Sequence, residues 1–429
     1  MTERNEALTA NIARYPWYLF FRDGYFWGPV FFLYFSSVLS LSEALHLEAV
    51  YYVAVAAAEV PSGYLADRFG RRRTLMCSSG CLGLAYLLFL TGHTFWQFAA
   101  AQLFLAAGFA SASGTDTALH YESLKDLGRE AEYASLEGRA LKYSLLAGGG
   151  AALLGGLAAA GHLRWVYGLS CATAMISLGI VMTMTEPEGA KGKVAAPFGP
   201  QLRHVLRKAR GPRLRFFTLY ALAMTVLLHI PYEFYQPYLK QALAWSGVGP
   251  SLVPPLSGMH LALTMGLGAF MTRFAGRIHH RCVVRRTLLA CALLQVVLIG
   301  AMALVVHPLV ALMLVGRTAS RAVSTPLVNA ELAPLLGRHE RSTYFSLQSL
   351  LGRLAYGCSL VVLPLGAALF EDSLHGALVC ALVLALCLVG VLFAVPFPWG
   401  EDPVCCRSRN HLDSPAAGSA GDVPEKPFA

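Results

Sequence analysis

The fold is decided by the segment Glu59–Leu75, which reads EVPSGYLADRFGRRRTL and lies between two apolar runs. Gly63 and Gly70 permit close backbone approach and positive φ angles, which favours a tight turn between two helices. Asp67 can accept hydrogen bonds from donors nearby, and the four arginines of the segment favour the cytoplasmic face of a membrane. We therefore expect two helices joined at the inner membrane surface; a purely topogenic basic loop is the alternative.

The composition is that of a membrane protein. Of the 429 residues, 56% are hydrophobic and 14% are charged, and the mean hydropathy is +0.52, far from the balance of a soluble domain. A helix needs about 20 apolar residues to cross a bilayer. Such runs predict an all-α integral membrane protein with twelve transmembrane helices: Trp17–Leu39, Leu47–Leu65, Leu75–Thr91, Trp96–Tyr121, Leu136–Ala160, Leu163–Met184, Phe216–Tyr238, Leu252–Phe274, Thr287–Val306, Pro308–Leu332, Tyr344–Leu369 and Leu374–Val395.

The distribution of basic residues predicts the orientation. With both termini in the cytoplasm, most of the 34 lysines and arginines fall in inward segments, and only Arg164 and Lys240 fall in outward loops. Cytoplasmic loops of membrane proteins carry this excess, so we expect a multi-pass protein of the plasma (inner) membrane with both termini inside. The net charge of +9 is explained by this topology, and a nucleic-acid partner is not expected.

The second half of the sequence repeats the first. The pattern Gly63-x4-Arg68-x3-Arg72 recurs as Gly276-x4-Arg281-x3-Arg285, with His280 in the place of Asp67. Six spans per half is an even number, so the halves should be parallel repeats. We expect four parts: an N-terminal six-helix bundle (1–185), a cytoplasmic linker (186–213), a C-terminal six-helix bundle (214–397) and a disordered cytoplasmic tail (398–429).

Ionisable residues of the first half cluster towards the cytoplasmic third of the predicted spans. Each costs at least about 2.5 kcal/mol at the centre of a bilayer, so each is a functional candidate. We expect an ion-pair network that locks the inner helix ends in the outward-facing state and breaks on inward opening; snorkelling at the helix ends is the alternative. The predicted inner gate consists of Glu59, Gly63, Asp67, Arg68, Gly70, Arg71, Arg72, Asp116 and Glu122.

Three arginines lie near the middle of predicted spans in the second half. Arg317 and Arg321 are four residues apart and share a helix face, and Arg353 lies on the next span. Few carboxylates of that half lie at matching depth, so an anionic group of a substrate would complement the guanidinium groups. Pairing across the pore with Asp23 or Asp116 is an equally good interpretation.

The predicted span Phe216–Tyr238 contains Pro231 and Pro237, which suggest a broken helix that exposes backbone polar groups to a cavity. Between them, Glu233 lies among aromatic residues. Desolvation disfavours the charged form of a carboxyl, so Glu233 is a proton-coupling candidate, as are Asp23 and Asp116. A hydrated Glu233 within an interfacial aromatic belt is the alternative.

The tyrosines near Glu233 would suit a partly aromatic or amphipathic substrate. Together with the arginines, they define the predicted substrate-binding residues: Arg22, Tyr25, Tyr232, Tyr235, Arg317, Arg321 and Arg353.

The pattern G-x-L-A-D-R-x-G-R-R at residues 63–72 resembles the signature loop between helices 2 and 3 of major facilitator superfamily transporters. With Glu59-Val60-Pro61-Ser62, the run Ser113–Leu124 and Pro231-Tyr232-Glu233, the chain resembles a bacterial exporter-like branch of that family. The resemblance implies two pseudo-symmetric six-helix bundles and transport by alternating access.

Two departures from the family pattern bear on coupling. The stretch Ala147–Gly156 lacks the proline and two of the glycines of the antiporter motif on helix 5, and Gln102 takes the place of the arginine usual on helix 4 of proton-coupled members.

The favoured hypothesis is a secondary active transporter that exports a small organic molecule, anionic or amphipathic, against proton entry. The candidates for its substrate are a metabolite, a drug or a siderophore-like molecule. An importer or facilitator of the same fold and a non-transporting membrane sensor or scaffold are the alternatives.

The sequence contains no G-x-S-x-G, no phosphate-binding Gly/Lys loop and no H-E-x-x-H. We therefore expect no enzymatic activity, catalytic residue, cofactor or metal. The expected partners are a small-molecule substrate, protons and the lipid bilayer, and the protein is expected to be a monomer.

Overall fold

The computed structural model describes residues 2–188, 206–281, 283–332, 335–336, 338–369 and 373–397, and the regular secondary structure in these ranges is entirely helical. For residues 2, 60–61, 63–65, 67, 134, 272–281 and 338–343 it describes the backbone and not the side chains. Most of the predicted linker and the predicted tail lie outside these ranges.

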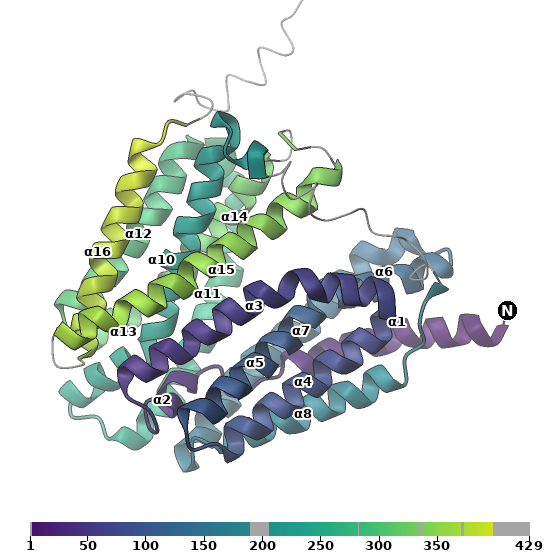
Figure 1. Cartoon of the computed structure of the whole chain (residues 1–429), viewed down its shortest axis with the longest axis horizontal. Coiled ribbons are helices and arrows are strands. Elements are labelled where there is room, and N and C mark those ends of the chain that lie inside the picture. Colours follow the sequence, from purple (N-terminus) through teal and green to yellow (C-terminus); the bar gives the residue numbers. More distant parts are fainter. Residues whose placement is uncertain are drawn as a thin grey trace, which may run out of the picture.

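The helices form two groups (Figure 1). The N-terminal group contains α1 (Thr2–Asp23), α2 (Phe31–Phe35), α3 (Leu41–Phe69), α4 (Arg71–Thr91), α5 (Phe95–Ala112), α6 (Thr115–Asp126), η1 (Glu130–Glu132), α7 (Tyr133–Gly161) and α8 (Trp165–Met182). The C-terminal group contains α10 (Pro212–Trp245), η3 (Pro250–Leu252), α11 (Val253–Arg281), α12 (Val284–Leu304), α13 (Pro308–Met313), η4 (Leu314–Thr318), α14 (Ala319–Leu332), α15 (Arg338–Leu369) and α16 (Leu374–Ala394).

Eight helical stretches in the described ranges are long and apolar enough to cross a membrane. Large apolar side chains on their outer faces, such as Leu154, Leu157 and Leu365, are more than half exposed. Extended apolar surface of this kind is what contact with lipid requires. The predicted class, an all-helical membrane protein, is therefore confirmed.

The turn within Glu59–Leu75 is shorter than predicted. The helix α3 continues through Gly63 to Phe69, and α4 begins at Arg71. Only Gly70 has a positive φ, of 94°, so the prediction that Gly63 belongs to the turn is wrong. A Cβ at Gly70 would lie 3.0 Å from the carboxylate of Glu186, which explains why this position is a glycine.

The predicted break in the Phe216–Tyr238 span is also wrong, because α10 is continuous across Pro231 and Pro237. A membrane helix tolerates proline where its neighbours satisfy the freed backbone groups. The helix is instead interrupted in the first predicted span, between α1 and α2 at residues 24–30. A second interruption lies at Gly114, which has a φ of 75°, and η4 separates α13 from α14.

Side chains of both groups hold the irregular segment between α1 and α2. The carboxamide oxygen of Gln236 accepts hydrogen bonds from the backbone N–H groups of Phe32 (2.9 Å) and Leu33 (3.3 Å), which the first turn of a helix leaves unsatisfied. The Ser257 hydroxyl donates to the carbonyl oxygen of Pro29 at 2.5 Å. Within the N-terminal group, the Ser170 hydroxyl accepts from the Phe26 N–H at 2.9 Å.

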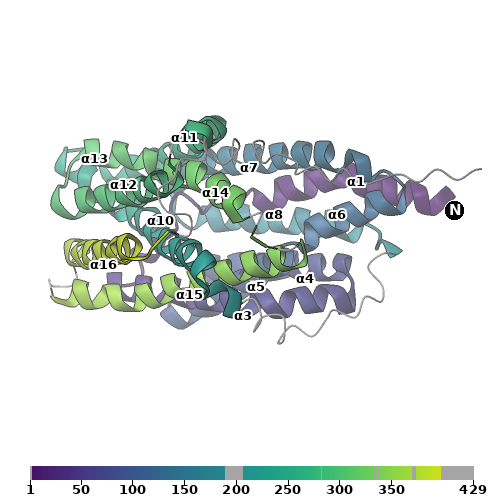
Figure 2. The same cartoon turned by 90° about the horizontal axis from the view of Figure 1, so that it is seen from above.

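Two helix pairs join the groups: α3 packs against α15, and α7 packs against α11. Figure 2 shows these pairs on opposite sides of the molecule. The linker end of the molecule is the end at which helices α3, α6 and α8 terminate. The far end is the opposite end, at which helices α7 and α10 terminate. The groups meet towards the far end, at the lower left of Figure 1, and diverge towards the linker end.

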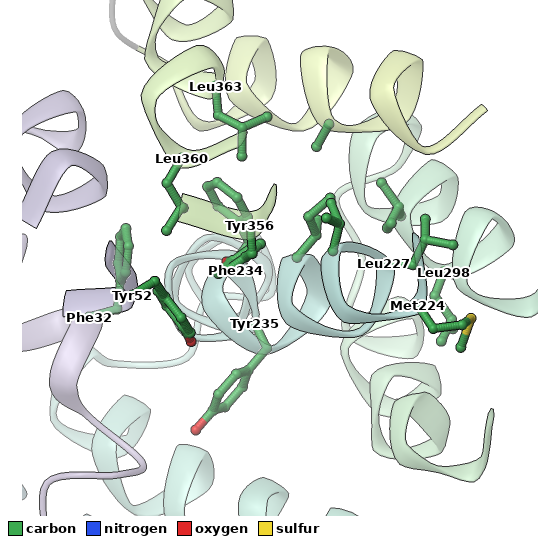
Figure 3. Packing of buried hydrophobic residues seen from close by; sticks show 14 of the residues in the cluster. Phe32, Tyr52, Met224, Leu227, Phe234, Tyr235, Leu298, Tyr356, Leu360 and Leu363 are labelled. Carbon is green, nitrogen blue, oxygen red and sulfur yellow. The ribbon is translucent and has the colours of Figure 1, made fainter. Parts of the chain in front are cut away.

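One hydrophobic cluster extends through both groups. Figure 3 shows part of it, where Tyr52 of α3 and Tyr356 of α15 lie close together. Their ring centroids are 4.7 Å apart, and Phe32 lies 6.2 Å from Phe234 of α10. Aromatic side chains thus pack the two groups against each other on the far-end side.

The close contact of α7 with α11 depends on glycine. A Cβ at Gly156 would lie 2.7 Å from the carbonyl oxygen of Pro254 and 3.0 Å from the Cα of Gly258. Both are backbone atoms, so a side chain there has to push the helices apart. Gly156, one of the two glycines of the helix 5 motif that this chain retains, therefore lies at the joint between the groups, whereas Gly155 faces the backbone of Phe26 in its own group.

We predict that Gly156→Ala destabilises the protein by about 1–3 kcal/mol, the usual cost of overpacking. The measurement is the thermal unfolding midpoint in detergent. Gly150→Ala is the matched control, because it lies on the same helix and no heavy atom lies within 4 Å of its Cβ position. An equal midpoint for the two variants would contradict the proposed contact.

Candidate functional site

A cavity of about 650 Å³ lies between the two groups. Its wall comes from the irregular segment, α2, α3, α4, α5, α7 and α8 on one side and from α10, α11, η4, α14 and α15 on the other. Aromatic side chains make up much of this wall: Tyr25, Trp27, Phe31, Phe35, Tyr51, Tyr52, Phe89, Phe109, Tyr167 and Tyr232. The cavity is therefore suited to a partly aromatic guest.

Two of the predicted substrate tyrosines line this cavity within stacked aromatic pairs. The ring of Tyr25 stacks on Trp27 with a centroid separation of 5.0 Å, and Tyr232 stacks on Phe31 at 5.8 Å. Tyr235 is buried behind the wall. The Cζ atom of Arg317 lies over its ring, 4.5 Å from the ring centroid.

Arg317 is the best buried of the three predicted arginines, with 2% of its surface exposed. Its Nη1 contacts Nδ1 of His260 (3.3 Å) and donates to the hydroxyl of Thr264 (3.2 Å). Nε2 of His260 lies 2.9 Å from the carbonyl oxygen of Ala311, so this nitrogen carries the ring proton and Nδ1 accepts. Nη2 of Arg317 is buried without a hydrogen-bond partner among the described residues.

The other two arginines, Arg321 and Arg353, also line the cavity, but they differ in whether they form an ion pair. Arg353 of α15 pairs with Glu59 of α3 at 3.2 Å, and Glu59 also accepts from the Ser349 hydroxyl at 3.3 Å. In the described part of the chain, Arg317 and Arg321 form no ion pair. The interpretation that these arginines pair with Asp23 or Asp116 across the pore is therefore wrong.

Arg22, Asp23 and Asp116 instead form a cluster within the N-terminal group. Arg22 pairs with Asp23 at 2.8 Å and also with Asp116, and the Ser144 hydroxyl donates to Asp23 at 2.6 Å. The structure thus brings together one predicted substrate residue and two predicted proton-coupling residues. It places all three outside the wall of the cavity.

Glu233, the third proton-coupling candidate, is fully buried. The hydroxyl of Tyr356 donates to its Oε2 at 3.4 Å, and its Oε1 has no partner in the described residues. The alternative that Glu233 is hydrated within an interfacial aromatic belt is therefore wrong. Glu233 lies behind the cavity wall at the joint between the two groups.

The predicted gate residues divide into separate contacts. Arg71 pairs with Glu122 at 2.6 Å between α4 and α6. The carboxylate of Glu186 accepts from the backbone N–H groups of Arg71 (2.7 Å) and Arg72 (2.8 Å), which caps the N-terminus of α4.

Neither of these contacts links the two groups, whereas the pair of Glu59 with Arg353 does. Arg68 places its guanidinium 5.7 Å from the ring of its neighbour Phe69. The side chain of Asp67 lies outside the described part, so the predicted role of Asp67 stays a prediction.

Sequence reasoning missed Glu48, which lines the cavity and is 6% exposed. Its Oε1 accepts from the Gln102 amide at 2.9 Å. The predicted span began at Leu47, which placed Glu48 at the membrane surface, whereas α3 begins at Leu41. The capping box of Ser40 with Glu43 is the signal that marks this earlier start.

The overall arrangement is shared with solved transporter structures. The nucleoside transporter NupG superposes with a TM-score of 0.75 at 11% identity, over 90% of this chain and 98% of NupG. A D-xylose-proton symporter gives 0.63 at 14% identity, over 92% and 99% of the two chains. A bacterial homologue of the human lysosomal transporter Spinster, in an inward-facing and occupied conformation, gives 0.65 at 16% identity, over 91% and 96%.

At these identities the superpositions establish the fold and not the substrate. No curated protein sequence matches the chain significantly. The family model described as Major Facilitator Superfamily matches residues 19–359, most of the helical part of the chain. This chain is therefore a multi-pass membrane protein of the Major Facilitator Superfamily, a transporter rather than an enzyme.

Proposed function

We propose that the protein is a secondary transporter that carries a small organic anion by alternating access. The observation that supports this most is Arg317, a buried guanidinium in the cavity wall with an unpartnered nitrogen. A buried charge is costly unless it is paired, and a carboxylate or phosphate group matches a guanidinium well. Arg321, which lines the same cavity, adds a second positive charge that forms no ion pair with the described residues.

The rest of the substrate is proposed to be aromatic or amphipathic. The wall offers the stacked pairs of Tyr25 with Trp27 and of Phe31 with Tyr232, and flat apolar groups pack well against such rings. A metabolite, a drug or a siderophore-like molecule of this chemistry would fit the proposal. In this assignment Arg22 supports the N-terminal helices and does not touch the substrate.

We further propose the twelve-span arrangement. In it, α1 with α2, α5 with α6, and α13 with α14 each make one crossing. Residues 1–185 and 214–397 are the two bundles, 186–213 is the linker and 398–429 is the tail. The linker end is cytoplasmic by the distribution of basic residues, the protein lies in the plasma membrane, and it works as a monomer.

With this orientation, the structure corresponds to a conformation closed towards the outside. On the cytoplasmic side, where the groups diverge, the pair of Glu59 with Arg353 still ties α3 to α15, and we assign this pair as the gate of the cavity. Because Arg353 also lines the cavity, a substrate anion that attracts its guanidinium would weaken the pair with Glu59. Binding and opening of this gate would thereby be coupled.

Export against proton entry is the proposed direction. Asp23 and Asp116 share Arg22, so a proton on either carboxylate would weaken that cluster, and Glu233 supplies a third carboxyl. Import by the same fold, or a sensor without transport, would appear in the flux measurement below as inward-only movement or as no movement.

Binding should require a negative charge on the ligand and Arg317 on the protein. We predict that aromatic carboxylates such as benzoate, or phosphate monoesters, raise the unfolding midpoint, and that their neutral amide or alcohol analogues do not. Arg317→Gln should weaken this binding roughly tenfold or more, the effect of losing a charge-assisted hydrogen bond. Arg139→Gln, an exposed arginine on α7, is the control. Equal effects of charged and neutral ligands would exclude the anion site.

Transport should depend on the proton gradient. In proteoliposomes, we expect the labelled form of the tightest-binding anion to move against its own gradient when a pH gradient is imposed. Collapse of the pH gradient with an ionophore should stop net uphill movement. Uphill flux that persists after collapse would rule out proton coupling.

Removal of the Glu59 charge should loosen the cytoplasmic gate. We predict that Glu59→Gln raises, several-fold, the rate at which an impermeant maleimide labels a cysteine at the cavity residue Ser113 from the linker end, in a background without native cysteines. The control is Glu132→Gln, which breaks the exposed pair with Arg129 on the surface. An unchanged or slower rate for Glu59→Gln would mean that the pair is no gate.

A further inference from the structure

Two carboxyl groups are buried at the joint between the helix groups without a cation beside them. Glu48 of α3 is 6% exposed and Glu233 of α10 is fully buried. Among the described residues their hydrogen-bond partners are neutral, the Gln102 amide for Glu48 and the Tyr356 hydroxyl for Glu233. Neither forms an ion pair in the described part of the chain.

The hydrogen-bonding geometry at each carboxyl leaves room for a proton. The carboxamide oxygen of Gln102 is buried and has no donor among the described residues, although its amide nitrogen donates to Glu48. A protonated Glu48 would supply that donor and complete a two-bond pair of acid and amide. At Glu233, Oε2 accepts from Tyr356 and Oε1 is unpartnered.

Two tyrosines that meet across the joint lie between the elements that carry the two acids. Tyr52 is four residues after Glu48 and so lies on the same face of α3. Its ring meets that of Tyr356 edge-on at 4.7 Å (Figure 3), and Tyr356 donates to Glu233. One acid belongs to each group, and the contact of α3 with α15 holds them together.

The titratable neighbours of these acids are mostly phenols. Tyr51 and Tyr52 of α3, Tyr167 of α8 and Tyr232 of α10 surround Glu48. Tyr52, Tyr232 and Tyr356 surround Glu233. The ring of His229 lies 4.9 Å from that of Tyr356, and its Nδ1 donates to the carbonyl of Thr225 at 2.6 Å. Two cations of the cavity wall act on His229, Arg321 and Arg353, and Arg353 is held by Glu59.

We propose that Glu48 and Glu233 form a pair of proton-binding sites, both occupied when the far end is closed, and that loss of these protons opens the far end. On closing, each carboxyl takes one proton from solution, and on opening each returns it. A bare carboxylate on either acid would be largely buried with no ion-pair partner among the described residues, so it favours the state in which the groups separate and more water enters. The closed state is therefore favoured at low pH and lost as the pH rises.

The inference rests on the proposed alternating-access function, and it adds Glu48 to the coupling machinery. It also gives a role to Gln102, which takes the place of the arginine usual in proton-coupled relatives. An arginine there would hold Glu48 ionised, whereas an amide tolerates a proton on it.

The test measures a distance across the far end without any substrate. Spin labels at Thr91→Cys of α4 and Ser251→Cys of η3, both exposed, report the separation in a chain whose ten native cysteines are replaced. Between about pH 5 and about pH 9, the wild-type chain should shift from a short to a longer distance. The Glu48→Gln/Glu233→Gln double variant, which mimics two bound protons, should keep the short distance throughout.

Glu43→Gln is the matched control on the same helix. Hydrogen bonds from the backbone and hydroxyl of Ser40 hold the pKa of Glu43 below its usual value, and glutamine preserves the capping box. This variant should respond to pH like the wild-type chain.

Two results would overturn the inference: a wild-type distance that does not change with pH, or a double variant that shifts as much as Glu43→Gln. The first result is measured on the chain without the glutamate substitutions, so it does not depend on whether the double variant folds. If the protein transports an anion but its far-end distance does not change with pH, only the proposed proton-binding sites are refuted. If the distance shifts with pH but the protein transports no anion, only the proposed transport function is refuted.

Discussion

A charge in the interior of a membrane protein needs a partner, and the rest of this structure depends on how that demand is met. Removing an ion from water costs several kcal/mol unless an opposite charge or several hydrogen bonds replace the solvent. Arg317 has hydrogen-bonding contacts to His260 and Thr264 and stacks on Tyr235, but no anion among the described residues pairs with it. The fold thus holds a fixed positive charge at a cavity that an anion could enter.

The two helix groups meet this demand differently. In the N-terminal group, Arg22 is matched by Asp23 and Asp116, and Arg71 by Glu122. In the C-terminal group, Arg317 and Glu233 are both buried, with neither an ion pair nor contact with each other in the described residues. The first group thus pairs these arginines internally, whereas Arg317 of the second group has no ion-pair partner among the described residues. Each group also buries one acid whose hydrogen-bond partner is neutral, Glu48 in the first and Glu233 in the second.

Much of the fold could be predicted from the sequence, because apolar length alone locates a membrane helix. The predicted span Pro308–Leu332 begins where α13 begins and ends where α14 ends. The helices α4 and α15 end at Thr91 and Leu369, as predicted. The error at Glu48 arose because hydropathy marks the apolar part of a helix and not its polar first turn. The break at residues 24–30 and the pairing of Glu59 with Arg353 depend on contacts between residues far apart in sequence, which no local pattern contains.

The most direct measurement is a structure of the protein determined with a transported anion bound. The account predicts a carboxylate or phosphate oxygen of that anion within hydrogen-bonding distance of Nη2 of Arg317, with its apolar part against the aromatic wall that includes Tyr25 and Tyr232. An anion bound elsewhere, with Nη2 still unpartnered, would contradict the claim that this guanidinium is the substrate site.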